Sequence, residues 1–200
     1  AVVRDISHEA ATEAKLTHQA LHDNLTGLHN RISLAGELQA RLDATVYTTG
    51  HVAVLFLDLD GFKQINDGLG HSMGDDLLVI VARRLETATR PGDIVARLGG
   101  DEFVVVCDEL TNPGEADSVA KRILSLLAEP FTLAGVETTI SASIGVAVSG
   151  AGGSDADTLL ARADTAMYQA KDLGRGRYET FDATMRRFAD RRDNTGKDLR

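Results

Sequence analysis

Two adjacent glycines, Gly99 and Gly100, lie between two apolar stretches of the chain, and Asp101, Glu102 and Phe103 follow at once. Glycine alone reaches positive φ without steric cost, so the pair predicts a tight turn that joins the two stretches as a hairpin. The turn would hold two carboxylates at the start of the second strand. A cation and a phosphorylated substrate could meet them there.

Apolar patterning along the rest of the chain predicts a mixture of helices and strands. The continuous apolar run from His51 to Leu57 suits a central strand buried on both faces, and Asp58-Leu59-Asp60-Gly61 follows it. The other strands are expected at 93–98, 102–108, 131–134, 137–148 and 176–181, with a hairpin around Ala134-Gly135. The helices are expected at 30–44, at 72–89, at 114–129, and from Asp155 or Asp157 to 172. This order predicts an α+β fold with a central, mainly antiparallel sheet flanked by helices.

Size, charge and cysteine content restrict the class of protein. The 200 residues are 43% hydrophobic, enough for one substantial core. The net charge of -9 argues against a nucleic-acid partner but allows a nucleotide carried in with Mg²⁺. The single cysteine, Cys107, excludes an internal disulfide and is expected to be buried. No apolar run approaches the ~20 residues of a membrane span, so we expect a cytoplasmic segment without direct membrane contact, although the parent protein could be tethered elsewhere.

Asp58 and Asp60 stand two residues apart at the end of the apolar run, so a strand would point both side chains to one side. Carboxylates at such an edge are costly unless they are hydrated or neutralised by a cation. The glycine turn would bring Asp101 close to them. Two acids and a main-chain carbonyl leave room for waters and phosphates, which suits Mg²⁺. The alternative, a solvated acidic edge, explains each residue singly but not the set.

Four segments of the chain combine glycines with polar residues at close spacing: Asp23–Arg31 (DNLTGLHNR), Asp58–Asp75 (DLDGFKQINDGLGHSMGD), Arg97–Phe103 (RLGGDEF) and Lys171–Arg177 (KDLGRGR). Together they resemble the motifs of the GGDEF diguanylate cyclases, enzymes that join two GTP molecules into cyclic di-GMP. The resemblance covers about residues 23 to 180 and implies the palm-like nucleotide cyclase fold. The first segment is interpreted as a helix cap and turn without chemistry of its own.

The resemblance implies a magnesium site, with Mn²⁺ as a possible substitute. Asp58, the carbonyl of Leu59 and Asp101 would hold the metal ions. Asp101 would also help to deprotonate the attacking 3′-OH. Because neighbours in a regular strand face opposite ways, Glu102 is expected to have a supporting role.

The same resemblance implies the contacts to GTP. The amides of Gly61 and Phe62 would meet phosphate oxygens, and Lys63 would follow as a positive charge. Asn66 and Asp75 would bind the guanine edge, and an unpaired Asp75 would reject ATP. His71 is expected either to line the nucleotide or to pack beneath the loop.

Two basic residues near the end of the last expected helix complete the implied nucleotide site. Lys171 and Arg175 would contact the triphosphate, with Gly174 as the helix cap. Gly176 stands where the family usually has asparagine. Basic residues also occur at helix ends for electrostatic reasons alone, which is the alternative for this pair.

Arg90 and Asp93 have the spacing of the R-x-x-D inhibitory site of many cyclases, where the product binds. Arginine suits bidentate contact with the phosphates or guanine of cyclic di-GMP. The alternative is a helix stop with a surface salt bridge of about 0–1 kcal/mol. We expect feedback inhibition by cyclic di-GMP at this site.

The two ends of the chain suggest a larger protein. Residues 1–22 resemble the end of a PAS-like domain followed by a linker helix, which is either solvated or part of a coiled coil. Residues 181–200 resemble a connector to an EAL phosphodiesterase domain. One domain binds one GTP, so the resemblance implies a catalytic homodimer. The alternatives are a catalytically silent GTP-binding domain that controls an attached phosphodiesterase, and a pure dimerisation module.

Overall fold

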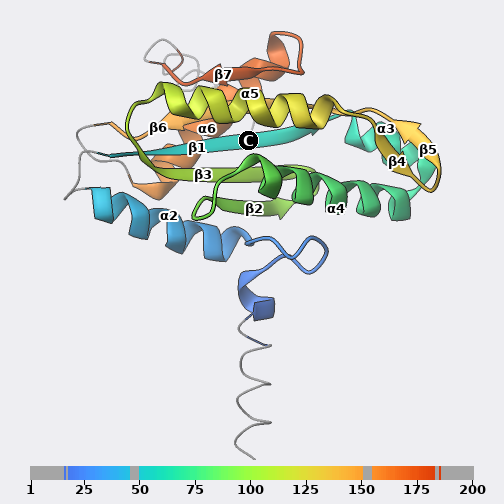
Figure 1. Ribbon diagram of the computed structural model, residues 1–200, viewed down its shortest axis with the longest axis horizontal. Coiled ribbons are helices and arrows are strands. Elements are labelled where there is room, and N and C mark those ends of the chain that lie inside the picture. The colour runs from blue at the N-terminus through green and yellow to red at the C-terminus, as the bar shows by residue number, and fades with distance from the viewer. Residues whose placement is uncertain (1–15, 17, 46–49, 151–154, 183–184, 186–200) are drawn as a thin grey trace, which may run out of the picture.

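The computed structural model describes residues 16, 18–45, 50–150, 155–182 and 185. A five-stranded sheet forms its centre, with strands in the order β2 (Ile94–Gly99), β3 (Glu102–Leu110), β1 (His51–Asp60), β6 (Ser141–Val148) and β7 (Tyr178–Thr180). Neighbouring strands are antiparallel except for β6 and β7, which run parallel. The predicted α+β fold with a mainly antiparallel sheet is therefore confirmed (Figure 1).

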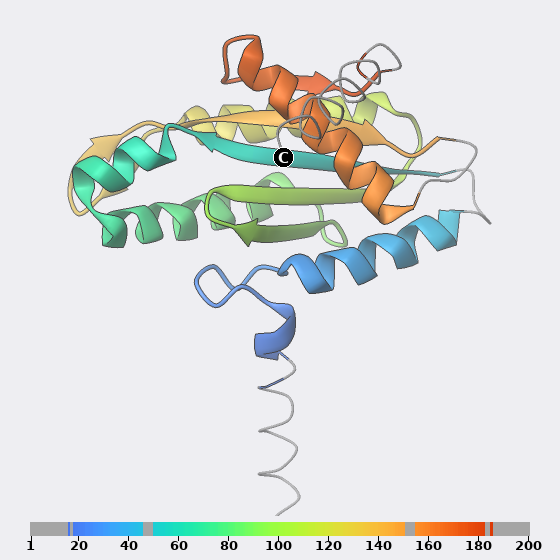
Figure 2. The same ribbon diagram turned by 180° about the vertical axis from the view of Figure 1, so that it is seen from behind.

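Helices cover both faces of this sheet. Helices α4 (His71–Ala88) and α5 (Gly114–Ala128) pack on one face, where they share a core with alternate residues of β1 and β3. Helices α2 (Arg31–Thr45) and α6 (Ala156–Asp172) pack on the other face, as Figure 2 shows. Burial on both faces explains why the strands are nearly continuous in apolar residues.

Strand β1 shows how the sheet sets the direction of each side chain. Ala53, Leu55, Leu57 and Leu59 belong to the core under α4 and α5, whereas Val52, Val54 and Phe56 belong to the core under α2 and α6. The strand continues to Asp60 instead of stopping before the acids. Because side chains alternate along a strand, Asp58 and Asp60 lie on the α2 and α6 face.

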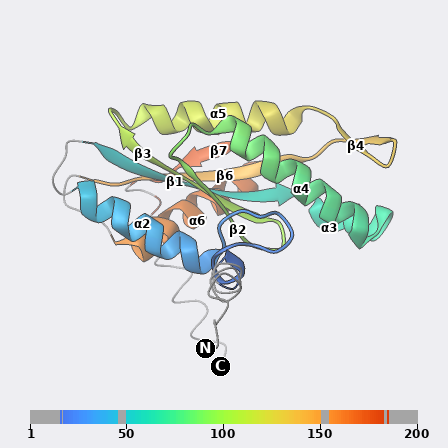
Figure 3. The ribbon, with the colours of Figure 1, turned by 60° about the horizontal axis from the view of Figure 1, so that its bottom comes forward.

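One sequence prediction about local structure is wrong, and one helix was not predicted. The strand predicted over 137–148 is divided into β5 (Val136–Thr138), which pairs with β4 (Phe131–Leu133) in a separate two-stranded sheet, and β6 in the central sheet. The β-branched residues Thr138, Thr139 and Ile140 continue across the break, so the strand-like composition of the segment did not reveal it. Residues 62–69, for which the sequence predicted no element, form helix α3 (Phe62–Leu69), which lies with β4 and β5 at one end of the molecule (Figure 3).

Cys107 is buried, with 1% of its surface exposed, as the sequence predicted. Burial raises the pKa of its thiol to about 12, so the thiolate is a negligible species at neutral pH.

The ends of the chain are only partly described. Residues 18–21 are helical. The strand-like opening, most of the expected linker helix and nearly all of the C-terminal connector lie outside the described residues. Within the described ranges, no helix combines the length and apolar character that crossing a membrane requires.

Candidate active site

The predicted acids meet at one end of β1. Asp58 pairs directly with Glu102 of β3, and directly paired residues of antiparallel strands share a face. The glycine turn is built as expected, with φ of 141° at Gly99 and 52° at Gly100. The amide of Leu59 donates to the carbonyl of Asp101 at 3.3 Å, which holds the turn against β1.

The negative charge of this cluster is not fully balanced by the positive charge around it. Burial raises the pKa of Asp58 above its ordinary value, and repulsion from Asp101 and Asp60 raises it further, while Lys171 lowers it. Burial also raises the pKa of Glu102, with repulsion from Asp58 as the next cause. Such a site favours a bound cation.

The last turn of α6 brings Lys171 to this cluster. Its Nζ lies 2.7 Å from Oδ2 of Asp58, and three quarters of the lysine side chain is shielded from solvent. The sequence predicted a phosphate contact for Lys171. In the structure, the lysine is paired with a carboxylate at the predicted metal site.

Asp60 has different partners from Asp58. Its carboxylate accepts hydrogen bonds from Ser143 Oγ at 2.7 Å, Ser141 Oγ at 2.8 Å and the amide of Gly176 at 3.0 Å. Arg175 Nε lies 3.9 Å from Oδ1 of the same carboxylate. Asp60 therefore ties β1 to β6 and to the loop after α6.

The donors at this edge suit a hard divalent cation. Among the described residues, no three histidine, cysteine, aspartate or glutamate side chains are grouped closely enough to hold a metal by themselves. A site built from two carboxylates and one main-chain carbonyl leaves coordination positions for water and phosphate, which is the arrangement Mg²⁺ prefers. Asp58, Asp101 and the carbonyl of Leu59 fit this description.

Helices α3 and α4 carry the other predicted nucleotide contacts. Gly61 precedes α3 with φ of 83°, and the side chain of Phe62 is buried in the core, so only its main chain can face a nucleotide. Lys63, on the next position, is exposed. The first N–H groups of a helix have no partner within the helix, and they suit phosphate oxygens.

Asn66 packs against Gly74, at the point where α3 and α4 meet. A Cβ at position 74 would lie 1.8 Å from Asn66 Oδ1, so only glycine allows this packing. Within the described part of the chain, Asn66 Oδ1 is buried and accepts no hydrogen bond. His71 and Asp75, on the first turns of α4, are exposed.

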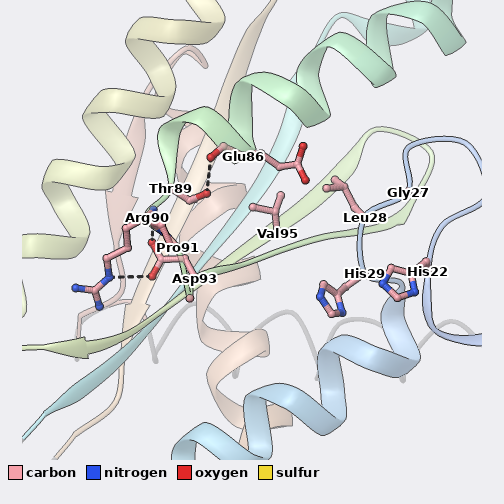
Figure 4. Close-up of a pocket in the computed structure, with 11 residues that line it drawn as sticks. His22, Gly27, Leu28, His29, Glu86, Thr89, Arg90, Pro91, Asp93 and Val95 are labelled. Atoms are coloured by element: carbon pink, nitrogen blue, oxygen red, sulfur yellow. Dashed lines mark hydrogen bonds and ion pairs between the residues drawn. The ribbon is translucent and has the colours of Figure 1, made fainter. Parts of the chain in front are cut away.

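Arg90 and Asp93 form an ion pair, with Arg90 Nε 3.2 Å from Asp93 Oδ1. The amide of Arg90 also donates to Asp93 Oδ2 at 3.0 Å, and the guanidinium reaches the carbonyl of Asp108. The two residues line one end of a pocket of about 450 Å³, with His22 and His29 at the other end (Figure 4). The salt bridge expected from the alternative interpretation is therefore present, and it lies beside a cavity.

Comparison with known proteins identifies the family. The sequence model described as "Diguanylate cyclase, GGDEF domain" matches residues 20–177. The chain belongs to the GGDEF diguanylate cyclase family. It is 42% identical over 176 residues to the bifunctional diguanylate cyclase/cyclic di-GMP phosphodiesterase MucR of Pseudomonas aeruginosa, covering 88% of this chain and 26% of MucR. It therefore spans about a quarter of that relative's length.

Two solved structures support the same conclusion about the fold. The GGDEF domain of TpbB from Pseudomonas aeruginosa superposes with a TM-score of 0.80 at 38% identity, covering 84% of this chain and 99% of that one. DgcB from Caulobacter crescentus, solved as a coiled coil and GGDEF domain in complex with cyclic di-GMP, gives a TM-score of 0.78 at 25% identity, covering 88% and 93%. This GGDEF domain therefore has the palm-like cyclase fold that its motifs implied.

The structure of this GGDEF domain also reveals a residue to which the sequence analysis gave no role. Arg97 Nη1 lies 3.0 Å and 3.1 Å from the two carboxylate oxygens of Asp23, and its Nε and Nη2 donate to the carbonyl of Gly100. Asp23 in turn accepts hydrogen bonds from the amide and hydroxyl of Thr26. The first motif is a cap and turn, as interpreted, but it also holds the signature turn. The adjacency of Arg97 to the glycine pair was the available signal.

Proposed function

We propose that this GGDEF domain is an active diguanylate cyclase, which condenses two GTP molecules into cyclic di-GMP and releases two pyrophosphates. The observation that carries the proposal is the grouping of Asp58, Asp101 and Glu102 at one sheet edge with Lys171 paired to the cluster. A purely structural edge would not need two like-charged carboxylates with raised pKa values directly across from one another.

The acids would hold the metal and take up the proton of the nucleophile, which is the ribose 3′-OH. Asp58, the carbonyl of Leu59 and Asp101 would bind Mg²⁺, or Mn²⁺ in its place, and a bound metal lowers the pKa of the ribose 3′-OH and neutralises phosphate charge. Asp101 would help to take up the 3′-OH proton. Glu102 would support the cluster from its position opposite Asp58. Once a cation balances Asp58, Lys171 is free to turn to the triphosphate.

The remaining contacts would orient GTP. The main-chain amides of Gly61 and Phe62 at the start of α3 would bind phosphate oxygens, with Lys63 beside them. Arg175, whose side chain is 63% exposed, would reach the phosphates from the loop after α6.

Asn66 and Asp75 would bind the guanine edge, with His71 beside the nucleotide. The buried and unpaired Asn66 Oδ1 supports a ligand at this place. Asp75 would accept from the two guanine donors, and adenine lacks that donor pair.

Catalysis would require two copies of the domain. One domain that binds one GTP supplies half of the product, so two domains must face each other with their nucleotides antiparallel. Residues 1–22 and 181–200 would connect the domain to upstream and downstream parts of the parent protein, and these connections would set the geometry of the dimer. We propose a homodimer as the active form.

The alternative is a silent GTP-binding domain that regulates an attached phosphodiesterase. The relative MucR is a bifunctional diguanylate cyclase/cyclic di-GMP phosphodiesterase, so it combines the two activities in one protein. The two proposals separate at the chemical step, because a silent domain would bind GTP without releasing pyrophosphate.

The decisive measurement is turnover of GTP with Mg²⁺ at high protein concentration, followed by separation of the nucleotides. We expect cyclic di-GMP, a specific activity that rises with protein concentration, and loss of at least ~100-fold in rate in Asp101→Ala. Binding of GTP by a demonstrated dimer without product would reject the cyclase in favour of the silent domain.

Arg90 and Asp93 would form a product-binding site beside the pocket shown in Figure 4. The solved complex of DgcB with cyclic di-GMP supports product binding by a member of this family. We expect an inhibition constant on the order of 1 μM, raised at least ~10-fold in Arg90→Ala. The test is the initial rate of GTP turnover in increasing cyclic di-GMP. Unchanged inhibition in the variant would leave the pair as a structural salt bridge.

A further inference from the structure

We propose that Asp60 is a positioning residue whose carboxylate anchors the loop after α6, so that Arg175 is presented to the nucleotide phosphates. This inference rests on the proposed cyclase function. The two acids of the D-x-D sequence would then have different roles. Asp58 would bind the cation, whereas Asp60 would be held by hydrogen bonds within the protein.

The hydrogen bonds of Asp60 leave little room for a metal. One oxygen accepts from Ser143, and the other accepts from Ser141 and the amide of Gly176. An ionised carboxylate offers about four lone-pair sites, and three of them are used here. The Asp60 side chain is only 6% exposed.

Asp58 contrasts with Asp60 although both lie on the same face of β1. Among the described residues Asp58 has a single ion-pair partner, Lys171, and its side chain is more exposed, at 15%. Lysine is a point charge on a flexible stem, so it can leave the carboxylate when a cation arrives. Hydroxyl and amide donors built into β6 and the loop cannot leave Asp60 in this way.

The loop has a backbone conformation that needs an anchor. Gly174, Arg175 and Gly176 follow one another with positive φ values of 116°, 63° and 59°. Arg175 is therefore a residue with a Cβ in the left-handed region, which is unfavourable unless the surrounding structure imposes it. The amide of Arg175 donates to the carbonyl of Ala170, and the next amide, that of Gly176, donates to Asp60.

The anchor also accounts for the departure from the family pattern at position 176. Glycine and asparagine are the residues that most readily adopt the left-handed conformation. Within the described part of the chain, a Cβ at position 176 would meet only the side chain of Ser141, at an ordinary 3.7 Å. Either residue can therefore supply the amide that Asp60 accepts, and glycine leaves the anchor intact.

The first test needs no nucleotide. Hydrogen exchange at the Gly176 amide is compared in the wild type, Asp60→Ala, Asp60→Asn and the control Asp157→Ala, which removes an exposed carboxylate at the far end of α6. We expect exchange at Gly176 to be at least ~10-fold faster in Asp60→Ala and unchanged in the control, with β1 amides protected in all four. If Asp60→Ala does not fold, the exchange rate at Gly176 in Asp60→Asn decides, because the asparagine side chain has the same shape. Unchanged exchange at Gly176 would overturn the anchor.

The second test separates positioning from metal binding. We expect the dissociation constant for GTP with Mg²⁺ to rise about 10-fold in Asp60→Ala and in Arg175→Ala, and the double variant to be no weaker than Arg175→Ala. The Mg²⁺ concentration that gives half of the maximal rate at saturating GTP should stay within ~2-fold of the wild type in Asp60→Asn.

Each contrary outcome has a distinct meaning. A ~10-fold rise in that Mg²⁺ concentration would make Asp60 a metal ligand. The positioning role would also be overturned if the effects of Asp60→Ala and Arg175→Ala on the GTP dissociation constant multiplied in the double variant. It would likewise be overturned if exchange at the Gly176 amide became faster in Asp60→Ala while the affinity for GTP did not change. If the wild type does not bind GTP at all, the proposed function fails instead, and with it the role of Arg175, while the exchange experiment still decides whether Asp60 anchors the loop.

Discussion

At the scale of single residues, the contact between Asn66 and Gly74 explains why this GGDEF domain needs a glycine inside a helix. A Cβ at position 74 would lie 1.8 Å from Asn66 Oδ1 and 3.3 Å from the ring of Phe62. The atom in the way belongs to a side chain that can rotate, so the fold can survive the substitution. The Asn66 side chain, however, would have to leave its present position.

We predict that Gly74→Ala weakens GTP binding about 10-fold, matching Asn66→Ala, while the free energy of unfolding changes by less than ~1 kcal/mol. Calorimetric titration with GTP and urea unfolding measure the two effects. Gly68→Ala is the matched control, because position 68 is an exposed helical glycine of α3 with no atom within 4 Å of the added Cβ. Unchanged GTP affinity in Gly74→Ala would remove Asn66 from the nucleotide site.

At the scale of elements, the packing of α6 on β6 sets the position of the basic residues. Gly145 lies in β6, and a Cβ there would be 1.9 Å from the carbonyl oxygen of Ala163 and 2.1 Å from the amide nitrogen of Met167. Both atoms are backbone atoms of α6, so the whole helix would have to move. Lys171 is carried at the end of that helix.

Gly145→Ala should therefore lower the free energy of unfolding by about 3 kcal/mol or more, and cyclase activity should fall with it. Urea unfolding followed by circular dichroism measures the loss. The control is Gly36→Ala on α2, where the added Cβ meets nothing within 4 Å and helix propensity predicts a gain of about 0.5–1 kcal/mol. A change of less than ~1 kcal/mol in Gly145→Ala would mean that α6 can shift on the sheet without cost.

At the scale of the whole molecule, Arg97 connects the first motif to the signature turn. Asp23 and Arg97 are 74 residues apart in the chain and form an ion pair that is largely shielded from solvent. Burial by itself raises the pKa of Asp23, but the hydrogen bonds from Thr26 and Arg97 outweigh it, so the pKa lies below its ordinary value of 3.8. The stabilisation is thus present above that pH and is lost as the pH falls through the lowered pKa.

Asp23→Asn should lower the free energy of unfolding by about 1–2 kcal/mol at pH 7. The difference from the wild type should begin to shrink as the pH falls below the ordinary value of 3.8, because the unfolded chain then takes up the proton, and it should be lost as the pH falls through the lowered pKa of the folded state. Urea titrations at pH 7 and pH 3 measure both values. Asp67→Asn, at an exposed position of α3, should change stability by less than ~0.5 kcal/mol at either pH. A difference at pH 3 as large as that at pH 7 would show that the ionised state of Asp23 is not what stabilises the turn.

Much of the fold was predictable because local patterns and tertiary structure agree. The apolar run of β1, the glycine turn and the helices flanked by caps and prolines all appeared at the expected places, within one or two residues. The break between β5 and β6 was missed because the β-branched residues Thr138, Thr139 and Ile140 continue across it, and which sheet a strand joins depends on distant partners. Helix α3 was missed because its motif was interpreted only as a series of nucleotide contacts.

Residue identity and spacing by themselves determined the family, the mixed sheet and the grouping of the acids, because a two-residue period and a tight turn are local properties of the backbone. Only the tertiary structure decided the partners of each charge. Asp58 and Asp60 look alike in the sequence, yet one pairs with a lysine and the other is bound by two serines and a loop amide. Strand pairing and the packing of α6 supply those partners from residues 81 to 116 positions away along the chain. No local pattern encodes such distances.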